Sequence, residues 1–336
     1  MPQITFQEAK QFLNNITQKD KVAIIYHDDG DGFASGILFY DWCKTKKATT
    51  KQFTFSFGKW DKKTNLEKFN KIIITDIAPD GLNEINPPSN KEIFYTDHHP
   101  KNTPIPEKIL AFQTSDQGYI PSSRTTGELT QLKPWLSLAG TISDAGDLYP
   151  ENETFIDNLL KKYNVTLDEF KQNISSVITN TLVFFEENPS KAFKIIQKIN
   201  SLEEIPKLKK YSEPIENEIG KFIKEYETKK EKINNINLYY INPKFSTKVI
   251  IINIISRENP DEILIFLSPK KSNPNILGIS SRHQSSKADL PSLLKSGIKG
   301  LENANAGGHL RAAGAQIQAE DLNQFKQNLK NRKPFK

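Results

Sequence analysis

Apolar runs that end abruptly in acidic or histidine residues are the main pattern in the first half of this 336-residue chain. Continuous apolar runs are typical of strands that are buried on both faces of a parallel sheet. Helical spacing of apolar residues follows the first run, over 33–46. Strands alternating with helices predict an α/β domain with a mostly parallel sheet. The expected strands are 22–26, 51–57, 71–75 and 92–96.

The pattern changes twice in the rest of the chain. From residue 151 it predicts helices over 152–163, 167–184, 189–199 and 214–233, the last so charged that it indicates a linker. After residue 234 it predicts strands over 238–241, 248–254, 262–267 and 276–280, then helices over 289–297 and 321–331. We therefore expect a parallel-sheet domain of residues 1–200, a helical linker of 201–234, and a smaller α/β domain of 235–336.

Acids and histidines follow the predicted elements of the first domain. They are His27, Asp28, Asp29 and Asp31 after the first run, Asp76 after the third, Asp97-His98-His99 after the fourth, and Asp144 after the apolar run 136–142. Ligands of open parallel sheets bind outside the carboxyl ends of the strands, so we expect these side chains to form one site. Carboxylates and imidazoles without sulfur suit Mn²⁺ or, less selectively, Mg²⁺, Fe²⁺, Co²⁺ or Zn²⁺.

Several converging acids favour two metal ions over one. Neighbouring carboxylates raise one another's pKa when no cation is present. Two divalent ions about 3.5–4 Å apart, bridged by Asp76, would offset this repulsion and activate water for a displacement at phosphorus. Each acid alone also has a structural interpretation as a helix cap or a turn residue. The occurrence of all the motifs in one predicted α/β domain favours the metal site.

Composition limits the binding partners and the cellular compartment that we expect. The net charge of +6 and the pI of about 9.0 permit a polyanionic partner without requiring one. The single cysteine, Cys43, excludes an internal disulfide framework and a cysteine zinc site, and it favours a reducing compartment. The N-terminus lacks the pattern of a signal peptide, and the longest apolar stretch, near 249–255, is too short to span a bilayer. We therefore expect a cytoplasmic protein without a membrane partner.

The C-terminal region carries a second motif, Gly307-Gly308-His309. Glycines let backbone N–H groups approach a phosphate closely, and His309 is able to donate a hydrogen bond to a phosphate oxygen. Arg282, at the end of a predicted strand, has the forked geometry that suits phosphate or carboxylate. A flexible turn explains the two glycines equally well, and His283 beside Arg282 is expected to be incidental.

These motifs in this order resemble the DHH phosphoesterase superfamily with its DHH-associated C-terminal domain. The resemblance covers nearly the whole chain and rests on residues 27–32, 76, 97–99, 140–144 and 307–309 with 312–314. It implies a hydrolase with two metal ions that prefers Mn²⁺, with Mg²⁺ or Co²⁺ as substitutes. It also implies a substrate that is held in a cleft between the two domains.

The resemblance assigns a role to each matching residue. The metal ligands would be His27, Asp29, Asp31, Asp76, His98 and Asp144. His99 would contact the scissile phosphate or its nucleophile, and Asp97 would support the histidines. A substrate phosphate would be held by Arg282, Gly307, Gly308 and His309.

The first motif departs from that of bacterial RecJ exonucleases. It begins with His27 where they have aspartate, and Gly30 replaces their alanine or valine. Asp28 is an additional acid without an assigned role. Asp147 competes with Asp144 for the fourth motif, and Asp144 is preferred because it follows Gly-Thr-Ile-Ser.

The leading hypothesis is a metal-dependent exonuclease that hydrolyses short single-stranded RNA or DNA to mononucleotides. The chain has no room for the added nucleic-acid-binding domains of bacterial RecJ, so it looks more like the oligoribonuclease branch or the small archaeal RecJ-like proteins. The alternatives are a phosphoesterase of small nucleotides such as pAp or linear or cyclic dinucleotides, an inorganic polyphosphatase, and a non-catalytic RecJ-like replication scaffold. Phe33, Phe57 and Tyr119 are candidates for stacking on bases. A homodimer, replication or repair partners, RNA or DNA preference and cleavage polarity all stay open.

Overall fold

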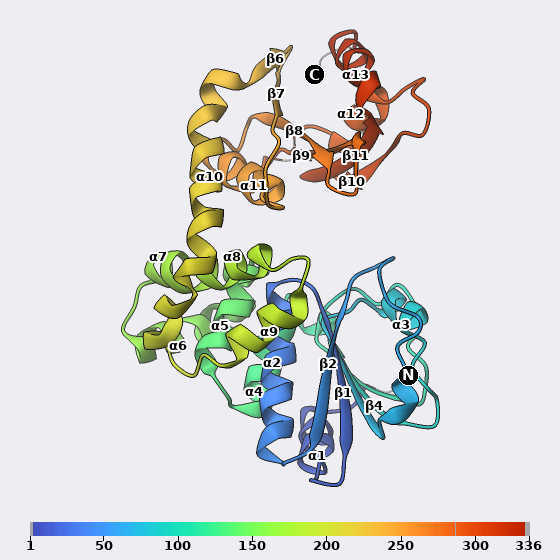
Figure 1. Ribbon diagram of the computed structural model, residues 1–336, viewed down its shortest axis with the longest axis vertical. Coiled ribbons are helices and arrows are strands. Elements are labelled where there is room, and N and C mark those ends of the chain that lie inside the picture. The colour runs from blue at the N-terminus through green and yellow to red at the C-terminus, as the bar shows by residue number, and fades with distance from the viewer. Residues whose placement is uncertain (1–2, 286, 333–336) are drawn as a thin grey trace. The chain divides into compact units, whose positions relative to one another are not determined.

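The computed structural model describes residues 3–285 and 287–332. The chain divides into two compact units, Met1–Ser212 and Glu213–Lys336, and each has its own sheet and its own apolar core (Figure 1). The boundary lies inside the segment 201–234 that was predicted to be a linker. Both sheets are accompanied by helices, so the predicted α/β class is confirmed. Within the described residues, no helix combines the length and the apolar character that crossing a bilayer requires.

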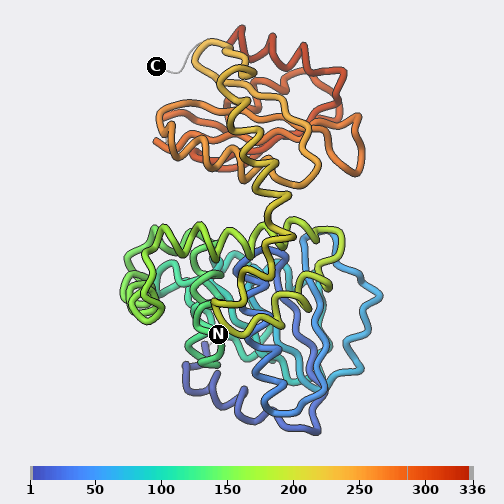
Figure 2. Tube along the Cα trace, turned by 60° about the vertical axis from the view of Figure 1, so that its left-hand side comes forward, coloured from blue at the N-terminus to red at the C-terminus, as the bar shows by residue number. Residues whose placement is uncertain are grey.

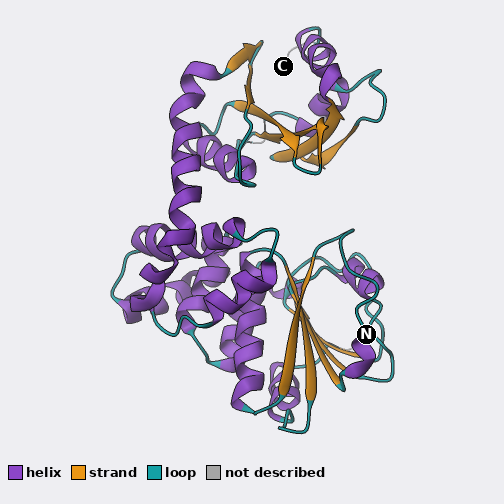
Figure 3. Cartoon of the chain, in the orientation of Figure 1, coloured by secondary structure: helices purple, strands orange, loops and turns teal. Residues whose placement is uncertain are grey.

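The N-terminal unit is built on a five-stranded sheet in which every pair of neighbours is parallel (Figure 3). The strand order is β2-β1-β3-β4-β5. The bounds are β1 (Lys21–His27), β2 (Thr49–Phe55), β3 (Lys71–Thr75), β4 (Glu92–Asp97) and β5 (Ile109–Gln113). Because all five strands run the same way, their carboxyl ends meet at one edge of the sheet. Strand β5 was missed in the sequence, where its short run carries no distinct signal.

The helices of this unit lie mainly on one side of the sheet, where α6 to α9 gather beside α2 and α5 (Figures 1 and 2). The bounds are α1 (Phe6–Asn14), α2 (Gly30–Thr45), α3 (Pro79–Ile85), α4 (Ser122–Thr130), α5 (Pro134–Ser143), α6 (Glu153–Tyr163), α7 (Leu167–Phe170), α8 (Ser176–Phe184) and α9 (Pro189–Gln197). A π-helical turn joins α7 to α8, so the predicted helix over 167–184 is one bent segment.

Two apolar cores explain why the strands read as continuous apolar runs. On β1, Val22, Ile24 and Tyr26 belong to the core shared with α2, whereas Ala23 and Ile25 belong to the core on the opposite face. Successive strand residues point to opposite faces, so a strand that is covered on both sides has no polar positions. The run stops where the strand leaves the sheet, and the acidic residues begin there.

The C-terminal unit has a six-stranded mixed sheet in the order β10-β11-β9-β8-β7-β6. The strands are β6 (Glu231–Ile233), β7 (Ile236–Tyr240), β8 (Ile263–Lys270), β9 (Asn273–Arg282), β10 (Asn305–His309) and β11 (Ala312–Gln318). The helices are α10 (Lys209–Lys229), α11 (Lys248–Glu258), α12 (Leu290–Gly297) and α13 (Leu322–Lys330). The β7–β8 pair is parallel, and the other neighbouring strands are antiparallel.

Two predictions for the C-terminal unit were wrong. Residues 248–254 form the start of helix α11 and not a strand. Their apolar residues are rich in isoleucine, but Ile251, Ile252 and Ile255 are buried on one side at helical spacing, and a short apolar run does not distinguish the two structures. The charged helix ends at Lys229, and 231–233 form β6. Gly307 and Gly308 lie in the edge strand β10, so the structure does not support the alternative interpretation of this motif as a flexible turn.

Candidate metal centre

The predicted site residues of the N-terminal unit lie at the carboxyl edge of the parallel sheet. His27 ends β1, and Asp29 and Asp31 occupy the N-cap and first turn of α2. Asp76 follows β3, and His98 follows β4. Asp144 is the C-cap of α5. Three neighbouring strands and two helix ends thus deliver their acids and imidazoles to one place.

The side chains form three compact groups within the described residues. One joins Asp76 and His98 to Asp97 and His99, and the other two hold the six predicted metal ligands. In one of these two, ligand atoms of His27, Asp29 and Asp76 all lie within 4.8 Å of one another. In the other, ligand atoms of Asp31, His98 and Asp144 do the same. Together these groups contain every predicted metal ligand.

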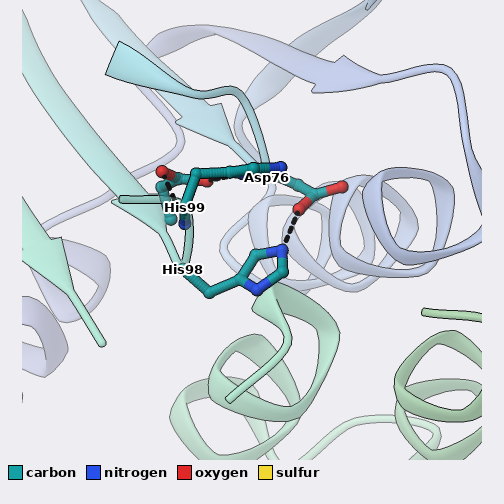
Figure 4. Close-up of side chains that lie close together, drawn as sticks. Asp76, His98 and His99 are labelled. Atoms are coloured by element: carbon teal, nitrogen blue, oxygen red, sulfur yellow. Dashed lines mark hydrogen bonds and ion pairs between the residues drawn. The ribbon is translucent and has the colours of Figure 1, made fainter. Parts of the chain in front are cut away.

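Asp76 connects the two groups. Its Oδ1 lies 3.3 Å from His98 Nε2, and its Oδ2 lies 3.9 Å from His27 Nδ1. Figure 4 shows the His98 ring pointing at the Asp76 carboxylate. The backbone of Asp76 has φ of 59°, a left-handed conformation that a residue with a Cβ seldom adopts. Such strain persists where the surrounding structure imposes it, and here it turns the side chain into the cluster.

Asp31 is held by the start of helix α4. Its two carboxylate oxygens accept hydrogen bonds from the backbone N–H groups of Ser122 (2.7 Å) and Ser123 (2.9 Å). The Ser122 hydroxyl also donates to Asp76 Oδ1 at 3.2 Å. A helix N-terminus has free N–H groups and favours negative charge, so α4 orients both acids. The role of these serines was not predicted from the sequence, although Pro121-Ser122 is a plausible helix start.

Burial and mutual repulsion disfavour ionisation of two of the acids. Burial, followed by the charges of Asp29 and Asp31, raises the pKa of Asp76 well above its ordinary value. Burial and the charge of Asp31 raise the pKa of Asp144 to about 8. The metal-free site therefore holds protons near neutral pH that a bound cation would displace.

His27 and Asp29 form an ion pair at the more exposed side of the cluster. His27 Nδ1 lies 2.8 Å from Asp29 Oδ2. Burial opposes both charges, but the hydrogen bond and the attraction between the two groups outweigh it. They raise the pKa of His27 and lower that of Asp29 to about 2. The other oxygen of Asp29 accepts a hydrogen bond from the Gly32 backbone at 2.9 Å, so Asp29 is also the helix cap that the structural interpretation expected.

His99 lies beside the metal ligands and is oriented by Asp97. Its Nδ1 is 2.7 Å from Asp97 Oδ1, and the Asp97 side chain is fully buried. The hydroxyl of Tyr95 donates to the other oxygen of Asp97 at 2.9 Å. Burial lowers the pKa of His99, but the hydrogen bond and the charge of Asp97 outweigh this and raise it. The pair therefore favours the protonated form of an imidazole at the edge of the cluster.

Tyr119 holds Asp144 in place. Its hydroxyl donates to Asp144 Oδ2 at 2.7 Å, and its ring packs edge-on against His98 with centroids 5.0 Å apart. The sequence suggested Tyr119 only as a stacking candidate. Of the other two candidates, Phe33 is buried in the core, and Phe57 is exposed on the loop after β2.

The structure also locates the two additional acids. Asp147 pairs with Lys171 at 2.6 Å and lies in none of the groups around Asp76 and His98. Asp28 is partly exposed, 3.5 Å from His27 Nε2, and accepts a hydrogen bond from Ser56. Asp28 therefore borders the cluster, whereas Asp147 has a partner elsewhere.

The residues present fit divalent cations. Asp76 Oδ2 is buried and has no hydrogen-bond partner in the described part of the chain, which is costly for a polar atom. The donor set of carboxylate oxygens and imidazole nitrogens without sulfur matches the preference of Mn²⁺ and related ions. A buried, unpartnered oxygen on the residue that connects the two ligand groups is the feature that a cation would resolve.

Three of the predicted phosphate residues, Arg282, Gly307 and His309, share one face of the C-terminal sheet, whereas Gly308 pairs with the core residue Ala313 on the other face. Ala312 on β11 pairs with His309 on β10 and with Arg282 on β9. Directly opposite residues point to the same face, so a small alanine separates the arginine from the histidine. Arg282 Nε donates to Asn253 Oδ1 on α11 at 2.7 Å, which fixes the guanidinium. His309 and Gly307 are exposed.

Lys248 adds a second cation to this face. Its Nζ donates to the Gly278 carbonyl at 2.6 Å. Burial and then the charges of Lys270 and Arg282 lower its pKa to about 8. An anion would relieve this repulsion. His283, in contrast, is buried with Nδ1 near the Glu262 carbonyl (3.3 Å) and Nε2 near the Ser285 hydroxyl (3.0 Å), as a structural residue would be.

The fold is similar to solved structures, although no family model matches the sequence and no curated protein sequence matches it. RecJ in complex with Mn²⁺ from Thermus thermophilus has a TM-score of 0.69 and 16% identity, over 98% of this chain and 55% of that one. Exonuclease RecJ bound to manganese has a TM-score of 0.68 and 14% identity, over 100% and 96%. The DHH domain of a member of the s1p family of ribosomal proteins has a TM-score of 0.65 and 14% identity, over 98% and 91%. The chain thus spans about half the length of the Thermus RecJ.

Proposed function

We propose that this chain, which has the fold of the DHH superfamily, is a metal-dependent phosphodiesterase that hydrolyses short single-stranded RNA or DNA to mononucleotides. The observation that carries the proposal is that Asp76 lies between two ligand groups and has a buried carboxylate oxygen, Oδ2, without a hydrogen-bond partner in the described part of the chain. The ligands would be His27, Asp29, Asp31, Asp76, His98 and Asp144. We propose two ions, with Mn²⁺ preferred.

The chain's own residues would complete the chemistry. A bound pair of divalent cations supplies Lewis-acid stabilisation of charge on a phosphoryl group. His99, which Asp97 orients and whose protonated form Asp97 favours, would donate a hydrogen bond to an oxygen of the scissile phosphate. Asp97 itself would not touch the substrate, because its oxygens already accept from His99 and Tyr95.

The C-terminal unit would bind a second phosphate of the substrate. Arg282 and His309 flank a small residue on one sheet face, and Lys248 adds positive charge there. A phosphate anchor together with a single cleavage site favours removal of one nucleotide at a time from an end. The same anchor would also bind a small nucleotide, so length dependence distinguishes the two substrate classes.

The test is Mn²⁺-dependent hydrolysis of end-labelled RNA and DNA of two to about twenty nucleotides, with pAp, cyclic dinucleotides and polyphosphate alongside. A ladder that grows from one end, strongest on short oligonucleotides, is expected, and the double variant His98→Ala, His99→Ala should abolish it. Hydrolysis of the small nucleotides alone would contradict the exonuclease and point to a nucleotide phosphoesterase. Turnover that survives the double variant would contradict the assigned site. Metal binding without any turnover would point to a scaffold.

A further inference from the structure

An aromatic pair extends outward from the candidate metal centre. Tyr119 touches His98 and Asp144, as described above, and Tyr149 stacks on its other side. The two tyrosine rings are 4.1 Å apart between centroids and 16° from parallel. Tyr149 is 40% exposed and its neighbour Leu148 is 68% exposed. A large aromatic ring therefore meets solvent one residue layer away from a predicted metal ligand.

The loops that carry the pair are fixed to each other. Asn152 is fully buried, and its Nδ2 donates to the carbonyls of Tyr119 (2.8 Å) and Gly146 (2.9 Å). The backbone N–H of Tyr119 donates to Glu151 Oε1 at 3.0 Å. A Cβ on Gly118, which has φ of 109°, would lie 2.1 Å from that oxygen, so a glycine is needed for the approach.

The segment of Glu151 and Asn152 is itself held by Arg124. Arg124 Nη1 donates to Asn152 Oδ1 at 2.9 Å and to the Glu151 carbonyl at 2.6 Å. The loops that carry the tyrosine pair are thus held by the buried Asn152 amide and by Arg124. A stacked exposed ring whose position is fixed before a ligand arrives loses little entropy on binding.

We propose that Tyr149 is a stacking platform for a nucleobase of the substrate, and that it gives the site its preference for nucleotides over base-free phosphoesters. This rests on the proposed function for the identity of the substrate. One face of the ring is covered by Tyr119, and the exposed remainder offers an aromatic surface beside the cluster where the phosphate would lie. Every base has a π-face, so such a platform is tolerant of sequence. Purines should bind more tightly than pyrimidines because they stack over a larger area.

The test is a binding measurement that does not depend on turnover. Isothermal titration calorimetry would compare a hydrolysis-resistant phosphorodithioate dinucleotide, pApA, with the same ligand carrying an abasic residue in place of one adenosine. Two abasic ligands would be used, one for each adenosine position of the dinucleotide, and all titrations would contain Mn²⁺. We expect Tyr149→Ala to weaken binding of the intact ligand about ten-fold, which corresponds to about 1.4 kcal/mol, and to remove the difference between intact and abasic ligands at one position. Tyr149→Phe should retain that difference.

A matched control is Tyr240→Ala, which removes a tyrosine of similar exposure (46%) from the C-terminal unit and should leave the discrimination intact. Equal binding of intact and abasic ligands by wild-type protein would contradict the proposed stacking role of Tyr149. A Tyr149→Ala variant that still binds the two ligands with different affinities would contradict it as well. The proposed function has a separate readout, hydrolysis of the unmodified dinucleotide by wild-type protein. Hydrolysis of the dinucleotide by a protein that binds intact and abasic ligands equally would contradict only the stacking role of Tyr149. A protein that binds the intact ligand more tightly than the abasic one but hydrolyses no dinucleotide would contradict only the proposed function.

Discussion

At the scale of single residues, the site is dominated by charge that metal-free protein accommodates poorly. Asp76 has a strained backbone, a buried unpaired oxygen and a raised pKa, and each of these features is unfavourable without a cation. Asp144 shares the raised pKa, although its hydroxyl partner Tyr119 partly offsets the cost. Residues that lower stability but converge on one point are typical of functional sites.

The raised pKa of Asp144 predicts that the folding stability of the metal-free protein depends on pH. Its pKa is about 8 in the folded protein and near 3.8 when unfolded, so the folded state binds the proton more tightly. This contribution to stability is complete below pH 4 and is lost as the pH rises to 8, by about 1.4 kcal/mol per pH unit. We expect metal-free Asp144→Asn to match the wild-type melting temperature near pH 4 and to exceed it by several degrees at pH 8.

Thermal melts across this pH range, with and without Mn²⁺, provide the check. Added Mn²⁺ should reverse the order at pH 8, because only the wild type retains the full ligand set. A variant that melts below the wild type at pH 8 without metal would show that Asp144 is not under electrostatic strain.

His99 is predicted to act on the substrate and not on the metal. His99→Gln removes the charged donor and should lower kcat by about 10²–10³, while the rise in melting temperature on adding Mn²⁺ is kept. Asp97→Asn should reduce activity in the same direction, because the amide has one acceptor oxygen for two donors, His99 and Tyr95, and no charge to favour the protonated ring. A His99→Gln protein that no longer responds to Mn²⁺ would instead make His99 a ligand.

At the scale of elements, strand ends and helix starts build the site. The first turn of α2 brings Asp29 and Asp31 close together because Gly32 packs against β1. A Cβ on Gly32 would lie 2.3 Å from the His27 carbonyl oxygen, which is backbone and has no easy way to move. The start of α4 then supplies the two N–H groups that fix Asp31.

Gly32→Ala should therefore damage the site more than the fold. We expect the helix start to shift and Mn²⁺ affinity to fall by about 10–100-fold, as when supporting contacts of a metal site are lost. The matched control is Gly220→Ala in α10, where an added Cβ has no atom within 4 Å. That change should leave affinity unaltered and raise stability by about 0.5–1 kcal/mol. Equal Mn²⁺ affinities for the two variants, measured by titration calorimetry, would contradict this account of α2.

The elements that build the site differ in how clearly the sequence predicts them. Both faces of β1, β3 and β4 are buried, so their runs were visible, and the acids stood out where the runs ended. The isoleucines of α11 were assigned to a strand because β-branched residues favour strands, and contact with β8 and β9 overrode that preference. The roles of Ser122, Tyr119 and Asn152 had no local signal, because each contacts a partner that is distant in sequence or belongs to another loop.

At the scale of the whole molecule, two units with separate cores carry separate parts of the proposed function. The acidic cluster belongs entirely to Met1–Ser212, and the cationic sheet face belongs to Glu213–Lys336. Metal binding and phosphate binding should therefore be separable by substitution. The net charge of +6 is compatible with any polyanion and does not itself select a nucleic acid.

The central claim is that the cluster around Asp76 is a metal centre, and counting bound Mn²⁺ by electron paramagnetic resonance tests it most directly. Free Mn²⁺ would be titrated into wild-type protein and into Asp76→Asn, with Asp147→Asn as a matched control outside the cluster. We predict two ions per chain, strongly reduced binding in Asp76→Asn, and wild-type binding in Asp147→Asn. Wild-type protein that binds no Mn²⁺, or an Asp76→Asn variant that binds as many ions as the wild type, would contradict the account.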